Sequence, residues 1–265
     1  MICKTVDNLN LYYAVKGNTH ATETLVFLNG LTQSTDSWIL MLPYFSEKYK
    51  IILLDFIFQG QSDKSGDWRD FDSHARDVKA VLVQEKIQSA NIIGISYGSL
   101  VGQHFAVLYP ELIKKLVLLS TFAHKTPYYE AIELSWWRAL EMGGYNLMLD
   151  IMLPSVLSES YFSNPLVSIS NIKSSRKDLN QNTDAIFSLM RATKERKDFR
   201  KELKKIRATT LIIQGEKDVL FPVHLAQEVQ ANIKNSKLIV VKNAGHTLNL
   251  EHVGEVSGYI NVFLN

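Results

Sequence analysis

The chain has 265 residues, of which 46% are hydrophobic and 21% are charged, and its formal net charge is +2. This composition is that of a globular protein with a packed core, and it excludes an intrinsically disordered chain. The small net charge gives no general attraction to nucleic acid or to an anionic membrane, so we expect neither as a partner. Cys3 is the single cysteine, which excludes an intramolecular disulfide and favours a reducing compartment.

The N-terminal segment MICKTVDNLNLYYAV lacks the apolar run of a signal peptide, and no eighteen consecutive apolar residues occur in the chain. We therefore expect no membrane span and a cytoplasmic location. We expect a monomer or a homodimer.

Short apolar runs along the chain predict the strands of a sheet. We expect an early strand at 10–15, which could pair with residues 2–6 across the turn at Asp7-Asn8. Continuous rather than alternating apolarity in the later runs is typical of parallel strands that are covered on both faces. These later runs span 23–28, 49–55, 89–95, 114–120, 209–215 and 237–243.

Helical patterns separate the strands, at 71–87, 98–109, 222–233 and 250–264. Strands and helices in alternation favour right-handed crossover connections. The sequence therefore predicts an α/β fold with a doubly wound, mostly parallel sheet.

Strands and helices do not alternate in the interval between the predicted strands at 114–120 and 209–215. It has no buried strand pattern, but it contains helical patterns at 129–152 and 183–205. The interval is too long for a loop in a compact domain. We expect a core formed by residues 1–121 and 206–265, with a helical cap inserted at 122–205.

The segment NIIGISYGSL at residues 91–100 contains the pattern Gly-x-Ser-x-Gly, with Gly94 and Gly98 on either side of Ser96. A sharp turn from a strand into a helix needs this spacing to hold a serine hydroxyl out for attack, because side chains at the two glycines would clash with the crowded backbone. Ser96 is therefore the candidate nucleophile.

A serine hydroxyl needs a base within hydrogen-bond reach to become a good nucleophile. His246 lies in NAGHTLN, just after the last predicted strand, on a short loop that could carry it over the sheet edge. His124 and His224 also follow predicted strands and are weaker candidates. We expect His246 to be the general base.

The base in turn needs an acceptor that fixes its tautomer and stabilises the imidazolium. Asp218 lies in QGEKDVLFP, directly after the strand at 209–215, and the next predicted strand ends close to His246. Loops at the ends of adjacent strands would bring the acid and the base together. Glu216 is the nearest alternative acid.

An acyl-transfer site also needs backbone N–H groups that point at the oxyanion, and each such donor contributes about 10²–10³ in rate. Tyr97 follows the nucleophile and provides one N–H group. We expect the loop LNGLTQS to provide the other from Leu31, with Gly30 allowing a close approach and Asn29 in the same turn.

Together these motifs resemble those of the α/β-hydrolase superfamily, and the resemblance covers essentially the whole chain. It rests on GISYGS around the serine, QGEKDVLFP around the acid, NAGHTLNLE around the base, and YPELIKKLVLLST after the turn. A further loop, DFIFQGQSDKS, matches the family pattern Asp-x-Arg-Gly-x-Gly-x-Ser at Asp55, Gly60 and Ser62.

The chain departs from the family pattern at two places. Asn29 stands where the family commonly has a histidine, and this exchange could alter how the loop is anchored. Ile57 and Phe58 replace the usual arginine and glycine, and we expect them to make the rim of the site more apolar. Neither change removes a member of the expected triad.

These roles imply a serine hydrolase that passes through an acyl-enzyme. Ser96 would attack an acyl carbon while His246 takes its proton, and water would later release the acyl group. No cofactor is needed. No metal is implied either, because the sequence has no HExxH motif and no close cluster of His, Cys and carboxylate residues.

Substrate choice must come mainly from the predicted cap, which is rich in large apolar residues. Trp136, Trp137, Tyr145, Met148 and Phe187 could line an apolar acyl pocket, or could simply pack the cap helices together. Few polar anchors accompany them, so a small aromatic ester or an apolar acyl ester fits better than a sugar or a peptide.

Several alternatives stay open. The basic stretch KERKDFRKELKKIR at 194–207 could dock an acidic acyl carrier protein, or could be a solvated helix. A carbon–carbon bond hydrolase of the meta-cleavage type would use the same triad, with Arg138 or Arg191 holding a substrate carboxylate. The third hypothesis is a ligand-sensing or scaffold protein that keeps the fold and has lost catalytic turnover.

Overall fold

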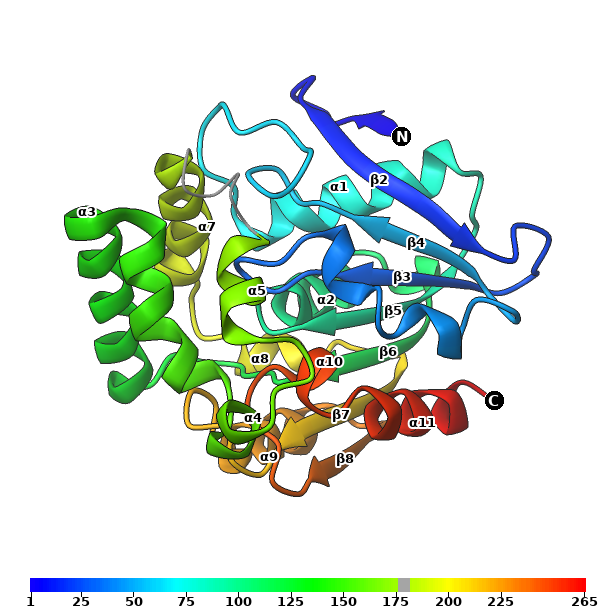
Figure 1. Cartoon of the computed structure of the whole chain (residues 1–265). Helices are drawn as coiled ribbons and strands as arrows, with labels where there is room; N and C mark the ends of the chain where they lie inside the picture. The colour runs from blue at the N-terminus through cyan, green and yellow to red at the C-terminus, as the bar shows by residue number, and fades with distance from the viewer. Residues whose placement is uncertain (176–181) are drawn as a thin grey trace.

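The computed structural model describes residues 1–175 and 182–265, and the strands among them form one eight-stranded sheet (Figure 1). The strand order is β1-β2-β4-β3-β5-β6-β7-β8, and all neighbours from β4 to β8 are parallel. The strands are β1 (Ile2–Lys4), β2 (Asn10–Gly17), β3 (Thr24–Leu28), β4 (Lys50–Leu54), β5 (Ala90–Ile95), β6 (Ile113–Leu119), β7 (Thr209–Gly215) and β8 (Ser236–Val241).

Burial along the central strands explains their continuous apolar sequence. Every residue of β3 and of β5 is buried, because helices cover both faces of the sheet there. Only β1 and β2 run antiparallel to their neighbours, as a hairpin at the sheet edge. The predicted α/β fold with a doubly wound, mostly parallel sheet is confirmed.

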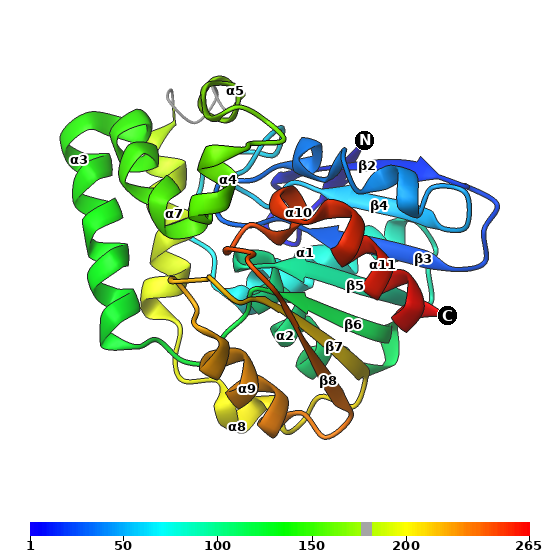
Figure 2. The ribbon, with the colours of Figure 1, turned by 60° about the horizontal axis from the view of Figure 1, so that its bottom comes forward.

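Two helical layers enclose the sheet (Figure 2). Helices α1, α2, α8 and α9 pack against one face, and the 3-10 turns η1 and η2 with α11 pack against the other. The bounds are η1 (Thr35–Trp38), η2 (Leu42–Tyr44), α1 (Phe71–Gln84), α2 (Tyr97–Leu108), η3 (Pro110–Leu112), α8 (Arg200–Leu203), α9 (Val223–Asn232), α10 (Leu248–Glu251) and α11 (Val253–Leu264).

Between β6 and β7 the chain leaves the sheet and forms a group of helices beside the carboxyl ends of the strands (Figure 1). This helical insertion is consistent with the expected cap, and its buried side chains belong to the same apolar cluster as α1 and α2. The expected boundaries at 122 and 205 stay a prediction. The helices are α3 (Pro127–Val156), α4 (Glu159–Ser163), α5 (Ile169–Ser174) and α7 (Thr183–Glu195).

Local signals set the limits of α3. The helix begins after Thr126, whose hydroxyl accepts a hydrogen bond from the Tyr129 N–H group at 3.1 Å. It is kinked at Gly143 and Gly144, and Gly144 has a φ of 66°, which favours glycine. From Tyr145 to its end the helix has no further residue with non-helical φ and ψ, although Pro154 lies inside it, and later side chains at helical spacing share one face.

Two predicted helices are divided in the structure. The pattern at 183–205 gives α7 and α8 with an extended segment between them, because Arg196 leaves the helical conformation with ψ of 125°. The pattern at 250–264 gives α10 and α11, because His252 has φ of −132° and ψ of 48°. Periodicity alone does not reveal these single non-helical residues.

Candidate active site

Ser96 lies in the turn between β5 and α2, at the carboxyl end of the central strands. Its φ of 51° and ψ of −118° are strained for a residue with a side chain, and such strain is typical of functional turns. A Cβ atom at Gly94 would lie 2.3 Å from the carbonyl oxygen of Gly98, and one at Gly98 would lie 2.1 Å from that of Leu28. Both glycines are therefore needed for the turn to form.

His246 and Asp218 are in direct contact. The Nδ1 atom of His246 lies 2.8 Å from Oδ2 of Asp218, and both residues are buried. Asp218 follows β7 and His246 follows β8, which are neighbouring parallel strands. The ring of Phe221 packs edge-on against the imidazole, with the centroids 4.9 Å apart.

The remaining partners of Asp218 fix the direction of that hydrogen bond. Oδ1 accepts from the N–H groups of Leu220 at 2.9 Å and Phe221 at 2.8 Å, and Oδ2 accepts from Nε2 of Gln214 at 2.7 Å. A carboxylate surrounded by donors is held as an acceptor, so His246 must donate from Nδ1. The basic nitrogen of the ring is then Nε2.

The loop that carries the histidine is tied to the helical insertion. The Glu251 carboxylate accepts from the N–H groups of Gly245 at 3.1 Å and Thr247 at 3.2 Å within this loop. It also accepts from the N–H of Ser158, which follows α3, at 3.0 Å. The Thr247 hydroxyl and N–H donate to the carbonyl oxygen of Val156 at 2.8 and 3.1 Å. These contacts position the histidine relative to the insertion.

Ser96 and His246 line one cavity of about 80 Å³. Gly30, Leu31 and Tyr97, three of the four residues expected around the oxyanion, line the same cavity. The structure thus brings the candidate nucleophile, the candidate base and the expected N–H donors to one small space.

Asn29 does not line that cavity. Its side chain is fully buried, donates to the carbonyl oxygen of Leu54 at 2.8 Å and accepts from the indole N–H of Trp38 at 2.8 Å. The residue that replaces the family's histidine therefore anchors the loop between β3 and η1.

Gln59 also holds this loop, and the sequence analysis did not single it out. Its fully buried amide donates to the carbonyl oxygens of Gly30 at 2.8 Å and Leu31 at 3.0 Å. The Gly30 N–H in turn donates to Oε1 of Gln33 at 3.0 Å. The only signal in the sequence was the position of Gln59 inside DFIFQGQSDKS, between Asp55 and Ser62.

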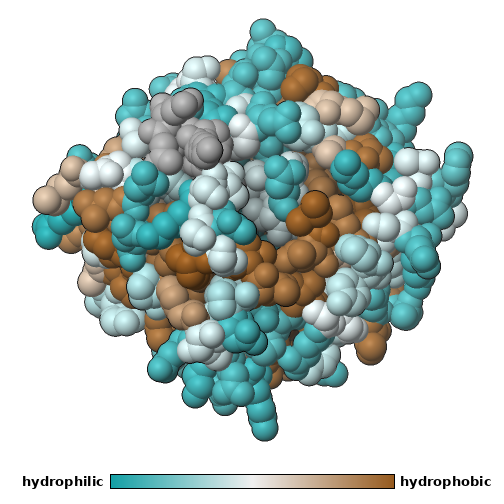
Figure 3. Space-filling view, in the orientation of Figure 1, coloured by the Kyte–Doolittle hydropathy of each residue, from teal (hydrophilic) through white to brown (hydrophobic). Residues whose placement is uncertain are grey.

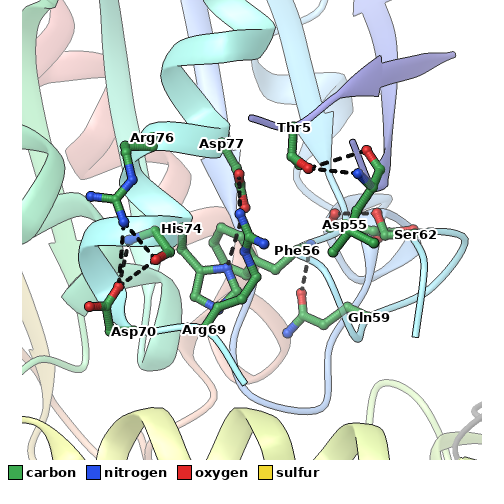
Figure 4. A network of polar contacts seen from close by, with 12 residues as sticks. Thr5, Asp55, Phe56, Gln59, Ser62, Arg69, Asp70, His74, Arg76 and Asp77 are labelled. Atoms are coloured by element: carbon green, nitrogen blue, oxygen red, sulfur yellow. Dashed lines mark hydrogen bonds and ion pairs between the residues drawn. The ribbon is translucent and has the colours of Figure 1, made fainter. Parts of the chain in front are cut away.

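The Asp55 carboxylate accepts from the N–H groups of Gln61 at 2.9 Å, in its own loop, and of Thr35 at 2.7 Å. Figure 4 shows Asp55 beside Ser62. A Cβ atom at Gly60, where φ is 44°, would lie 2.0 Å from Oδ2 of Asp55, and the Ser62 hydroxyl donates to the Asp55 carbonyl at 2.6 Å. Ile57 and Phe58 are buried in the core and do not line the cavity, so the expectation of a more apolar rim was wrong for them.

Behind the serine turn, Tyr97 reaches into a buried polar cluster, part of which is drawn in Figure 4. Its hydroxyl lies 2.8 Å from Nε2 of His74, and burial lowers the pKa of His74 to about 3. Nδ1 of His74 faces Oδ2 of Asp77 at 4.0 Å, and Arg69 donates to Oδ1 of Asp77 at 2.7 Å. Burial raises the pKa of Asp77 to about 7. The hydrogen bond between the Tyr97 hydroxyl and a neutral His74 holds the first residue of α2.

The five candidate pocket residues occupy different places. Trp136 lines the cavity with Ser96, and Tyr145 lines a neighbouring cavity. Met148 is fully buried in the core. Trp137 and Phe187 pack on each other with their centroids 4.7 Å apart and line neither cavity.

The alternative acid and bases lie elsewhere. Glu216 is exposed, and its carboxylate accepts from the N–H of Asn243 at 3.2 Å. His124 lies 2.8 Å from Glu228, away from the cavity, and His224 does not line it either.

Only part of the basic stretch 194–207 is exposed at the surface. Arg196 is buried, donates to Oε1 of Gln103 at 2.7 Å and has a pKa lowered by burial to about 9. Arg200 pairs with Asp198 and with Glu228. The exposed cations of this stretch are Lys194, Lys197, Lys201, Lys204, Lys205 and Arg207.

The described residues form no group of three or more His, Cys, Asp or Glu side chains that could hold a metal ion. Within the same residues, no helix combines the length and the apolar character needed to cross a membrane.

Comparison with known proteins places the chain in a family. The family model described as the alpha/beta hydrolase fold matches residues 23–253, which is most of the chain. The chain belongs to the α/β-hydrolase family. The resemblance noted from the motifs is therefore confirmed, and a hydrolytic enzyme is the coarse class that the family supports.

Two relatives of this α/β hydrolase are each less than 30% identical to it. It is 27% identical over 278 residues to the uncharacterized hydrolase YugF of Bacillus subtilis, covering 98% of this chain and 96% of that protein. It is 28% identical over 258 residues to an Escherichia coli 2-hydroxy-6-oxononadienedioate/2-hydroxy-6-oxononatrienedioate hydrolase, covering 91% and 87%.

A solved structure with similar coverage is an alpha/beta hydrolase enzyme from a Medee basin deep-sea metagenome library. Its TM-score is 0.87 and its sequence identity is 27%, over 97% of this chain and 94% of that one. These relatives support the fold and the hydrolytic class, and they differ in what they are named to act on.

Proposed function

We propose that this α/β hydrolase cleaves carboxylic esters of apolar substrates through an acyl-enzyme on Ser96. The observation that carries the proposal is the single cavity shared by Ser96 and His246, with His246 hydrogen-bonded to Asp218 at 2.8 Å. A serine with a base whose tautomer is fixed by a buried carboxylate is the arrangement that acyl transfer needs.

In the proposed mechanism Ser96 attacks the acyl carbon while Nε2 of His246 takes the hydroxyl proton. The tetrahedral oxyanion accepts hydrogen bonds from the backbone N–H groups of Leu31 and Tyr97. The imidazolium, stabilised by Asp218, protonates the leaving alcohol, and the same nitrogen then activates water to hydrolyse the acyl-enzyme.

A fluorophosphonate probe tests the nucleophile directly. We expect the protein to be labelled, and we expect Ser96→Ala to abolish labelling. The same change should lower the rate on p-nitrophenyl butanoate by about 10⁴–10⁶. A rate within tenfold of the parent would overturn the mechanism, and a folded protein that neither labels nor hydrolyses esters would favour a ligand sensor.

A carbon–carbon bond hydrolase is the second candidate, because the Escherichia coli relative is named for a dienedioate substrate. Such a dicarboxylate needs a cationic partner in the pocket. Among the described residues that line the cavity, no Lys or Arg occurs, and Arg191 instead lies over the ring of Trp68 at 4.9 Å. The apolar lining favours the ester, and parallel assays on an aryl ester and a meta-cleavage product separate the two activities.

A carrier-bound ester or thioester is a narrower version of the proposal. Lys201 and Lys204 are exposed on the basic stretch and could contact an acidic carrier protein. Reversing both charges should then raise KM for the carrier substrate and leave a small aryl ester unaffected. Equal effects on the two substrates would remove the carrier from the proposal.

A further inference from the structure

The cavity at Ser96 is too small to hold a large substrate. Its volume is about 80 Å³, whereas pockets that bury a drug-sized ligand have volumes of about 300–1,000 Å³. It can enclose the ester group and a short substituent. Any longer part of the substrate must extend into a neighbouring space.

Such a space adjoins it. A second cavity, of about 390 Å³, shares five wall residues with the first. We call this second cavity the α3 groove. The two cavities therefore adjoin each other at these five residues. The shared residues are Thr32, Gln33, Met152, Val156 and Thr247.

One face of α3 gives the groove its direction. Tyr145, Leu149, Met152 and Val156 line it and recur at helical spacing on one side of the regular part of the helix. Met152 and Val156 also wall the cavity at Ser96, but Tyr145 and Leu149 do not. The groove therefore runs from the reacting centre back along α3, over about 16 Å at 1.5 Å per residue.

The groove opens to the surface, and its α3 wall is apolar, whereas polar residues such as Ser34, Asn171 and Asn249 line other parts of it. Leu149 is buried on one side, and Leu40 and Leu250 line the other. Asp36 is the single charged residue among the described lining residues, and Ile39 at the mouth is 65% exposed. Figure 3 shows apolar surface gathered in the middle of this face, in the area where α5 and α10 lie in Figure 1.

We propose that the α3 groove binds an unbranched apolar chain that is attached to the scissile ester, on either its acyl or its alcohol side. This inference rests on the proposed esterase activity and names its substrate class. Against the α3 wall, which is apolar, a sugar or a peptide would leave polar groups unpaired. Each buried methylene of an alkyl chain instead improves binding by about fourfold.

A chain-length series tests the proposal and identifies the side that carries the chain. Rates on p-nitrophenyl acetate, butanoate and octanoate report an acyl chain, and rates on ethyl, butyl and octyl acetate report an alcohol chain. We expect kcat/KM to rise by about fourfold per methylene in one series until the groove is filled. A flat or falling profile in both series overturns the proposal.

Substitutions in the α3 groove test whether this groove causes the chain-length dependence of kcat/KM. Leu149→Trp fills it, and we expect kcat/KM for the long-chain substrate to fall at least tenfold while the acetate stays within threefold. Leu147→Trp, on an exposed and non-lining position of the same helix, is the matched control and should change neither. If Leu149→Trp does not fold, Leu40→Trp narrows the groove from a half-buried position. Equal losses on short and long substrates would overturn the assignment.

Binding to the Ser96→Ala protein separates this inference from the esterase itself. Calorimetry should show ethyl octanoate binding at least tenfold more tightly than ethyl acetate, with the difference lost in Leu149→Trp. Selective binding without ester hydrolysis by the parent would support the groove and overturn the esterase. Ester hydrolysis without selective binding would support the esterase and overturn the groove.

Discussion

The side-chain amide of Gln59 bridges two successive carbonyl oxygens, of Gly30 at 2.8 Å and of Leu31 at 3.0 Å. The Gly30 carbonyl and the Leu31 N–H group, which we propose as an oxyanion donor, belong to the same trans peptide and point in opposite directions. Because Gln59 holds this carbonyl and the next one, it fixes the direction of that N–H. Gln59 is thus a positioning residue that acts through the loop.

Gln59→Ala should lower kcat by about tenfold to a hundredfold with little change in KM, because a misdirected oxyanion donor weakens the transition state more than the ground state. Steady-state rates on an aryl ester measure the separate effects on kcat and on KM. Gln61→Ala, at an exposed position in the same loop, is the control and should be neutral. An equal rise in KM with constant kcat would show that Gln59 shapes the binding space instead.

Asp218→Asn should lower kcat/KM by about 10³–10⁴, since an amide at this position no longer holds His246 with a proton on Nδ1. Glu216→Gln is the matched control, because Glu216 is the nearby exposed carboxylate and contacts the N–H of Asn243 rather than the imidazole. Its activity should stay within threefold of the parent. A larger loss for Glu216→Gln than for Asp218→Asn would reverse the assignment of the acid.

The approximate places of Ser96, Asp218 and His246 could be predicted from the sequence for one physical reason. Each follows a run of buried apolar residues, and the carboxyl ends of parallel strands meet at one edge of the sheet. The glycines on either side of Ser96 add a steric signal that does not depend on distant parts of the chain.

The supporting contacts could not be predicted in the same way. Gln59 reaches the loop after β3 from the loop after β4, and Glu251 joins the histidine loop to the end of α3. Both contacts depend on how separate loops pack, which leaves no periodic trace in the sequence. The residues that line the pocket could not be predicted either. Trp136 and Met148 are both apolar residues of α3, but Trp136 faces the cavity and Met148 faces the core, and the sequence does not distinguish these directions.

Glu251→Gln should destabilise the protein by about 1–3 kcal/mol and lower kcat/KM by tenfold or more. The carboxylate accepts from three backbone N–H groups, of Gly245, Thr247 and Ser158. The NH2 group of an amide cannot accept a hydrogen bond, so at least one of these backbone N–H groups would lose its partner. Denaturant unfolding and aryl-ester rates measure the two effects. Glu255→Gln, an exposed carboxylate on the following helix, should leave both unchanged.

The buried carboxyl group of Glu133 should make the free energy of unfolding depend on pH. The residue is 8% exposed, and burial raises the pKa of its carboxyl to about 7, from an ordinary value of 4.5. Between pH of about 4.5 and about 7 the unfolded chain therefore has this group ionised while the native protein keeps it protonated. The native state binds more protons in this window, so the unfolding free energy falls as the pH rises.

Glu133→Gln removes this titration and keeps an oxygen acceptor for the Tyr129 hydroxyl, which donates to Oε1 at 3.0 Å. Relative to the parent, the variant should gain stability as the pH rises from 5 to 8, by up to about 3 kcal/mol. Melting temperatures across this range measure the difference. Glu130→Gln, an exposed position on the same helix with Lys125 nearby, is the control and should show a constant difference. A pH-independent offset for Glu133→Gln would mean that the carboxyl ionises alike in the native and unfolded states.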